Sequence, residues 1–299
     1  SQWMANDCTV CTTLVDTIVP GRIRDPKEAA AVAERLGYED PFLAVREPFQ
    51  MWGIQGDESL KERLPFVKAG LPGVFVTPDV TPYKKRKVRI LNGAHTAFVP
   101  GSWVAGFDIV RDCMHDETVR GFMNTMLYDE VIPTLAADLD VEDCKAFAAA
   151  VENRFDNPFI DHALLSICLN STAKWRARDL PTLKDYAAET GNLPKCLATS
   201  LATLISFYTQ ELVSREGDGL HLRRSDGTEY TAQDDAFVLD FYAAHAGADD
   251  AELVHDVLSN EQMWGEDLTQ IAGLEEFVVN ALAVVRSEGV KQAFANAQA

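Results

Sequence analysis

The sequence has few basic residues, with 27 Lys and Arg against 46 Asp and Glu in 299 residues, a formal charge of −19. Nucleic acids and anionic membranes need basic protein surface, so we expect neither as a partner. No apolar run reaches the roughly 20 residues of a membrane-spanning helix. Ser1-Gln2-Trp3-Met4 lacks the basic start and apolar stretch of a secretory signal. Cytoplasmic residence is the default expectation.

Cysteine is also scarce, and its placement does not favour a metal site. Cys8 and Cys11 form a CxxC, which is compatible with a redox pair or half of a zinc site. No second CxxC and no HxxxH completes such a site. We therefore interpret the pair as two small buried residues and expect no metal. The other four cysteines lie singly in apolar, helix-like stretches, where Cys acts as a small hydrophobe: Cys113, Cys144, Cys168 and Cys196.

Nucleotide-binding signatures are missing as well. The sequence contains no GxGxxG after a strand and no GxxxxGK[ST]. Such glycine-rich turns let a helix N-terminus approach a pyrophosphate. We expect that this chain alone does not bind NAD(H), so that it has no cofactor-binding residues of its own.

The pattern of residues predicts a short mixed α/β beginning followed by a large helical part. Strands are expected within residues 8–20, 42–54 and 74–77. Asp25-Pro26 and Gly37 predict the start and end of a short helix. A helix should begin at Thr81-Pro82 and end near Val99, before Pro100. Further helices are expected at 116–135, 141–155, 158–169, 183–189, 194–213, 234–246, 251–258 and 274–294, with a β-hairpin at 220–231.

A basic segment, Lys87-Val88-Arg89-Ile90-Leu91-Asn92-Gly93-Ala94-His95, carries the candidate chemistry. At about 100° per residue, Asn92 and His95 lie about 140° and about 80° round a helix from Lys87. Lys87 could act as acid/base if its pKa falls towards roughly 7–8, helped by neighbouring cations and burial. Asn92 and His95 could stabilise an oxygen that becomes an alkoxide.

A structural interpretation of this segment is also open. A basic helix start is often solvated, and Asn and His can satisfy local hydrogen bonds. Gly93 costs a helix roughly 1 kcal/mol relative to Ala. This cost favours a close approach of some group to the backbone at that point.

This segment resembles the catalytic signature of the mannitol dehydrogenase superfamily, in which the Lys is the acid/base and the Asn and His hold the reacting oxygen. Other motifs follow the family's order. They are the segments 13–21 (TLVDTIVPG), 47–54 (EPFQMWGI), 79–83 (DVTPY) and 157–160 (NPFI), together with Lys174.

The resemblance implies the fold, the substrate contacts and the cofactor. The expected fold class is mainly α: residues 1–40 would be the remnant of a Rossmann domain, and residues 41–299 a helical substrate domain. Substrate contacts would come from Lys174, Asn157 and Ser166. NAD would be bound by an N-terminal Rossmann domain that precedes the start of this sequence and would be a partner of this chain.

One departure from the mannitol-type pattern favours a subfamily. Ser166 stands where those members carry Arg, eight residues before Lys174. The strings LLSICLNS and KVRILNGAHT are more similar to the tagaturonate reductases, which interconvert tagaturonate and altronate with NAD. Two alternatives stay open. One is a fructuronate or mannitol dehydrogenase, and the other is a non-catalytic, truncated helical module.

Overall fold

The computed structural model describes residues 2–23 and 25–299, which form two compact units, Ser1–Lys87 and Val88–Ala299. The fold is mainly α, as the sequence predicts, with two small three-stranded sheets. No helix in the described ranges is long and apolar enough to cross a membrane. The sequence predicts a division after residue 40 into a remnant of a Rossmann domain and a substrate domain. That division stays a prediction.

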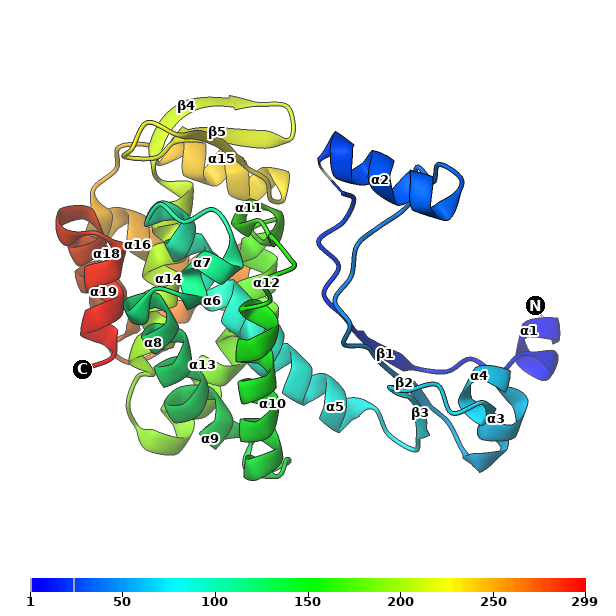
Figure 1. The fold of residues 1–299 in the computed structure, drawn as a ribbon. Coiled ribbons are helices and arrows are strands. Elements are labelled where there is room, and N and C mark those ends of the chain that lie inside the picture. The colour runs from blue at the N-terminus through cyan, green and yellow to red at the C-terminus, as the bar shows by residue number, and fades with distance from the viewer. Residues whose placement is uncertain (1, 24) are drawn as a thin grey trace. The chain divides into compact units, whose positions relative to one another are not determined.

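The first unit is built around the sheet β1-β2-β3, in which β1 and β2 are antiparallel and β2 and β3 parallel (Figure 1). One small core contains Leu14, Met51 and Val80, and a second contains Ile54 and Leu60. The elements of this unit are α1 (Gln2–Asp7), β1 (Thr13–Asp16), α2 (Pro26–Leu36), β2 (Met51–Gln55), α3 (Glu58–Arg63), α4 (Pro65–Lys68), β3 (Val74–Thr77) and α5 (Thr81–Arg86).

Local signals explain α2 and the segment that follows β1. The Asp25 side chain accepts from the Lys27 amide at the start of α2, and Gly37 ends the helix at φ 80°. Glu47 is 2% exposed and accepts from the Ile18 amide at 2.6 Å. The Glu47 amide donates to the Ile18 carbonyl at 3.1 Å. Glu47 of the 47–54 motif therefore fastens the 13–21 motif by two hydrogen bonds.

A continuous helical run leads from one unit into the next as α5, the π-helix η1 (Lys87–Asn92) and α6 (Gly93–Val104). The prediction that the helix ends before Pro100 is wrong, because Pro100 lies inside α6. Pro costs a helix interior about 3 kcal/mol. Every residue from Gly93 to Trp103 is buried, and burial of a single large apolar side chain contributes about 1.5–3 kcal/mol. Packing therefore outweighs the local penalty.

The second unit packs around α14, whose residues Cys196–Tyr208 are all buried. Helices α6, α18 and α19 contact it (Figure 1). Gly101 permits one of these approaches, since a Cβ there would lie 2.8 Å from the Phe294 ring and 2.9 Å from Thr203 Cβ. The elements that precede α14 are α7 (Val110–Met114), α8 (Glu117–Thr125), the π-helix η2 (Met126–Val131), α9 (Ile132–Leu135), α10 (Val141–Phe155), α11 (Leu164–Ile167), α12 (Ser171–Arg178) and α13 (Leu180–Thr190).

The C-terminal part of this unit contains the second sheet and the last helices. The predicted hairpin is present as β5 and β6, which pair antiparallel. The helix predicted for 194–213 is too long, because α14 ends at Tyr208 and β4 follows. The elements are α14 (Lys195–Tyr208), β4 (Glu211–Glu216), β5 (Gly219–Arg223), β6 (Glu229–Ala232), α15 (Ala236–Ala244), α16 (Asp250–Leu258), α17 (Glu261–Trp264), η3 (Leu268–Gln270), α18 (Leu274–Glu288) and α19 (Val290–Ala297).

Two other predicted helices also differ from the structure. The helix predicted for 158–169 is reduced to the four residues of α11. The helix predicted for 274–294 is broken at Gly289, whose φ of 91° suits glycine and ends α18.

The four cysteines expected inside helical stretches are buried, whereas Cys8 and Cys11 are only partly buried, contrary to expectation.

Candidate functional site

Lys87 belongs to the first unit, where its ammonium group contacts β1. Its Nζ donates to the Val15 carbonyl oxygen at 2.6 Å and lies 3.9 Å from Asp16 Oδ1. The side chains of Lys87 and Asp16 are 19% and 2% exposed. This buried carboxylate was not anticipated by the sequence analysis, which placed only cations around Lys87. Asp16 therefore places a carboxylate beside the Lys87 ammonium group, at 3.9 Å.

The backbone of η1 changes the spacing that an α-helix would give. A π-helix bonds residue i to i+5 instead of i+4, and π-helical turns are frequent at functional sites. Lys87 and Asn92 are the two ends of η1 and are five residues apart. A π-turn therefore brings these two positions closer to the same face than the ideal α-helical spacing predicts.

His95 is the most deeply buried of the predicted catalytic residues. It is 5% exposed, and its ring stacks on Phe155 at 4.0 Å and meets the His162 ring edge-on at 5.5 Å. Burial holds the pKa of His95 well below its ordinary value, and the charges of His162 and Arg178 act in the same direction. The imidazole is therefore neutral at pH 7. Within the described residues, its buried Nε2 has no hydrogen-bond partner.

Gly93 allows the side chain of Asp179 to approach the backbone of α6 closely. The presence of a glycine inside a helix predicts such an approach. A Cβ at Gly93 would lie 2.8 Å from Asp179 Oδ1. Asp179 is 2% exposed, and burial raises the pKa of its carboxyl well above the ordinary value. The neighbouring Arg178 donates to Thr96 Oγ1 at 2.9 Å and to the Asn92 carbonyl oxygen at 3.4 Å. The junction between α12 and α13 therefore supports the turn that carries Asn92.

Lys174 lies on α12, and Asp234, which is 62 residues from Thr172 in sequence, caps the N-terminus of this helix. Asp234 accepts from the Thr172 amide at 3.0 Å and from the Tyr208 hydroxyl. Lys174 Nζ donates to the Ile167 carbonyl oxygen at 2.9 Å. Burial lowers the pKa of Lys174, followed by the charge of Arg178. Lys174 also contributes to the low pKa of His95, so its positive charge acts on the His95 ring.

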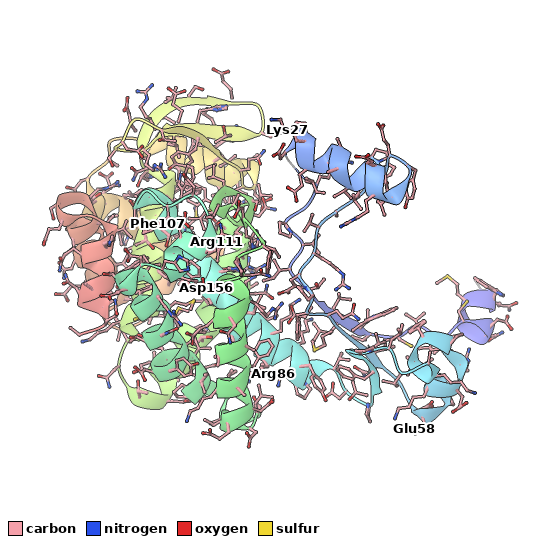
Figure 2. All side chains as sticks on the ribbon, viewed as in Figure 1. Lys27, Glu58, Arg86, Phe107, Arg111 and Asp156 are labelled. Atoms are coloured by element: carbon pink, nitrogen blue, oxygen red, sulfur yellow. The ribbon has the colours of Figure 1, made fainter. Side chains whose placement is uncertain are left out.

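The side chains of Asn157 and Ser166 form hydrogen bonds with backbone groups two or three residues away in sequence. Asn157 is half-buried, and its side chain accepts from the Phe159 amide at 3.0 Å. Arg111, labelled in Figure 2, holds this loop by donating to the Pro158 carbonyl oxygen at 2.9 Å. Ser166 is exposed and donates to the Ala163 carbonyl oxygen at 2.7 Å. Both side chains make local hydrogen bonds, and their roles as substrate contacts stay predictions.

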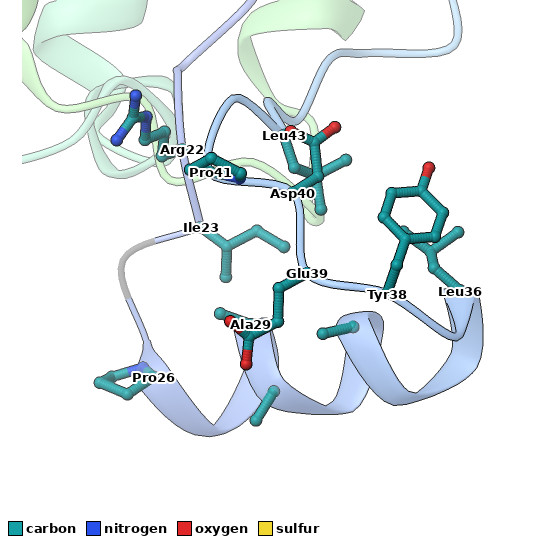
Figure 3. Close-up of a pocket in the computed structure, with 12 residues that line it drawn as sticks. Arg22, Ile23, Pro26, Ala29, Leu36, Tyr38, Glu39, Asp40, Pro41 and Leu43 are labelled. Atoms are coloured by element: carbon teal, nitrogen blue, oxygen red, sulfur yellow. The ribbon is translucent and has the colours of Figure 1, made fainter.

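Two of the pockets in the described part of the first unit are large enough to hold a small molecule. Figure 3 shows one of about 610 Å³ that α2 and the following loop line, with Tyr38 and Glu39 in its wall. It contains none of the predicted site residues. A second pocket, of about 350 Å³, is lined by Asp16, Trp52 and Arg46 among others. Through Asp16 it adjoins the Lys87 ammonium group.

The described residues contain no cluster of side chains that could hold a metal ion. No group of three or more His, Cys, Asp or Glu side chains in 2–23 and 25–299 has the arrangement to hold an ion. The polar groups near Asn92 include the cation Arg178, the neutral imidazole of His95 and the buried carboxyl of Asp179, whose pKa is raised. Such groups can orient and polarise an oxygen of a bound substrate.

Sequence reasoning missed three neighbours of the motif residues: Asp16 beside Lys87 in the first unit, and Arg178 and Asp179 beside Asn92 and Gly93 in the second. Asp16 is far from Lys87 in sequence, and the antiparallel pairing of β1 with β2 sets its position. Arg178 and Asp179 are more than 80 residues from Asn92. The only sequence signal was the glycine at position 93, which required a close neighbour without identifying it.

Comparison with known proteins shows similarity to the C-terminal part of a dehydrogenase family. The sequence model of the mannitol dehydrogenase C-terminal domain matches residues 79–286. An altronate oxidoreductase of Yersinia enterocolitica is 40% identical over 301 residues, covering 99% of this chain and 59% of the relative. One of Klebsiella pneumoniae is 43% identical over 298 residues, covering 98% of this chain and 58% of the relative. The chain thus spans less than two thirds of the length of these relatives.

Two solved structures share the fold. Pseudomonas fluorescens mannitol 2-dehydrogenase, in a ternary complex with NAD and D-mannitol, superposes with a TM-score of 0.77 at 22% identity. That match covers 99% of this chain and 55% of the dehydrogenase. A substrate-free D-sorbitol dehydrogenase superposes with a TM-score of 0.75 at 21% identity, covering 98% of this chain and 56% of that one.

Proposed function

The chain belongs to the mannitol dehydrogenase C-terminal domain family, and from this premise we propose that it is the substrate-binding part of an NAD-dependent sugar-acid dehydrogenase that interconverts tagaturonate and altronate. The substrate class is taken from the altronate oxidoreductases that are 40–43% identical to nearly the whole chain. NAD is the cofactor in the related mannitol 2-dehydrogenase complex.

One observation carries the proposal for the site. The buried His95 Nε2 has no hydrogen-bond partner in the described part of the chain. An unsatisfied buried polar atom costs about 1–3 kcal/mol, so its retention needs an explanation. A substrate oxygen is a suitable partner, because the neutral imidazole can donate a hydrogen bond to it. Asn92 lies three residues earlier on the same helical run and can supply a second donor.

In this proposal Lys87 is the acid/base of the reaction. It donates a proton to the keto oxygen during reduction and receives it during oxidation. Asn92 and His95 hold the same oxygen while negative charge develops on it. Asp16 holds the Lys87 side chain by charge, and Lys174 contacts the substrate. Asn157 and Ser166 are proposed as further substrate contacts.

The cofactor requires residues outside this chain. NAD(H), when bound to a complete enzyme, supplies or accepts the hydride. The sequence has no GxGxxG turn, and we therefore propose that a dinucleotide-binding domain is a partner of this chain. No cofactor contact is assigned to the residues described here.

The experiment that tests this function is a substrate panel with the complete enzyme, this chain together with its dinucleotide-binding domain. We expect NADH oxidation with tagaturonate at a higher kcat/KM than with fructuronate or fructose. Faster turnover of fructuronate or fructose would assign a different substrate within the same class. The absence of turnover with all three would favour a non-catalytic helical module.

A further inference from the structure

Two half-buried cations lie one turn apart on α12. Lys174 and Arg178 are four residues apart, so they share a helix face. Their hydrogen bonds go to uncharged oxygens: Lys174 to a carbonyl, and Arg178 to a carbonyl and a hydroxyl. Within residues 2–23 and 25–299, neither forms an ion pair with an Asp or Glu side chain. This is unexpected in a protein with a formal charge of −19.

Burial makes such a pair unfavourable without a compensating anion. Removal from water lowers the pKa of both Lys174 and Arg178, and the charge of Arg178 adds to the effect on Lys174. The charge of Asp234 opposes the effect of burial on the pKa of Lys174, and that of Asp179 does so for Arg178. In the described part of the chain, however, neither carboxyl forms an ion pair with these cations, and both have other contacts. Asp234 caps the start of α12, and Asp179 lies buried against Gly93.

The guanidinium of Arg178 retains donors for a ligand. In the described residues only its Nη1 makes hydrogen bonds, so the N–H groups of Nε and Nη2 keep their hydrogen-bonding capacity. These two nitrogens form the edge that binds a carboxylate through two parallel hydrogen bonds. Its Nη1 also contacts the Asn92 carbonyl oxygen, so this edge lies beside the turn proposed to hold the reacting oxygen.

We propose that Arg178, with Lys174 beside it, is the specificity-determining residue that binds the carboxylate of a sugar-acid substrate. The inference rests on the proposed function of the same site and identifies how a sugar acid is distinguished from a neutral polyol. A polyol presents hydroxyl groups but no charge, so it does not compensate the two cations. A carboxylate does, and it also accepts one hydrogen bond from Nε and one from Nη2 of the guanidinium.

The test compares altronate with its neutral counterpart altritol. Oxidation of both is measured with the complete enzyme and NAD, and binding of both to the 299-residue chain is measured by NMR. Arg178→Gln should lower kcat/KM for altronate about 10- to 100-fold, the value of a charge-assisted hydrogen bond. The loss should lie mainly in KM and should be much smaller for altritol, which loses only the support that Arg178 gives to the Asn92 turn. Arg178→Lys should recover part of the preference.

Arg176→Gln is the matched control, because Arg176 is exposed on the same helix and its loss changes the net charge equally. It should leave both substrates unchanged. Equal losses for altronate and altritol in Arg178→Gln would overturn the inference and leave Arg178 as a support of Asn92. If the unmodified enzyme does not oxidise altronate, the proposed function fails. The inference is then judged by binding, and altronate binding no tighter than altritol would overturn it.

Discussion

Glu130 offers a quantitative test of the electrostatics in the second unit. It lies in η2, is 5% exposed, and accepts from the amides of Cys196 and Leu197 at 2.7 and 2.9 Å. These amides begin α14, whose N-cap Pro194 provides no side-chain cap. The two donors favour the carboxylate, but burial has the larger effect and raises the pKa of Glu130 from 4.5 to about 7.

The raised pKa fixes the sign of the pH dependence. Between pH 4.5 and about 7 the folded state binds more protons at Glu130 than the unfolded state does. The contribution of Glu130 to the unfolding free energy is therefore fully present below pH 4.5 and is lost as the pH rises through about 7. At about 1.4 kcal/mol per pH unit, the contribution lost is about 3 kcal/mol. Glu130→Gln keeps the size of the side chain and cannot titrate, so its unfolding free energy should lack this term.

The assay is urea unfolding of the wild-type and Glu130→Gln proteins from pH 4 to pH 8. The difference between their unfolding free energies should change by about 3 kcal/mol across this range. Glu142→Gln is the control, because the Glu142 side chain is 80% exposed, and it should show no comparable change. A difference independent of pH would refute the reasoning, since the two amide bonds would then fully offset the effect of burial on the pKa of Glu130.

Two further predictions concern packing and thiol accessibility. Gly93→Ala should lower the unfolding free energy, measured in urea, by up to about 2 kcal/mol. Overpacking against the buried Asp179 costs about 1–3 kcal/mol, and the gain in helix propensity is about 1 kcal/mol. A gain in stability would mean that Asp179 moves aside at little cost. In the folded protein a thiol reagent should modify the partly buried Cys8 and Cys11 first, and rapid reaction of more than two thiols would contradict the described burial. The cysteines expected to react only on unfolding are Cys113, Cys144, Cys168 and Cys196.

Local sequence signals predicted the elements whose ends are fixed by their own residues. Helix α2 begins and ends where Asp25-Pro26 and Gly37 indicated. Helix α10 follows the predicted range 141–155, with Asp140 as its N-cap. Caps and glycine turns act over a few residues, so they can be read without knowledge of the rest of the chain.

Packing determined the elements that were predicted wrongly. Pro100 normally ends a helix, but α6 is buried on all sides and continues through it. Leu212 and Val213 extend the helical spacing of apolar residues past Tyr208, yet the chain there turns into β4, which pairs with β5. These outcomes depend on partners distant in sequence, which hydrophobic periodicity does not identify.

The candidate site shows the same division. The motif located Lys87, Asn92 and His95, and Gly93 indicated a close neighbour. The identity of the neighbours could not be deduced, because Asp16, Arg178 and Asp179 come from other elements. The spacing of the motif on an ideal α-helix was also only approximate, since η1 is a π-helix.

The most direct test of the central claim is the turnover of a Lys87→Ala enzyme that includes its dinucleotide-binding domain. If Lys87 transfers the proton, kcat for tagaturonate reduction should fall roughly 10²- to 10⁴-fold, with a much smaller change in substrate affinity. Lys85→Ala removes the same charge two residues earlier and should cost little. Equal losses in both variants would contradict the account, because the basic segment would then serve only to attract anions.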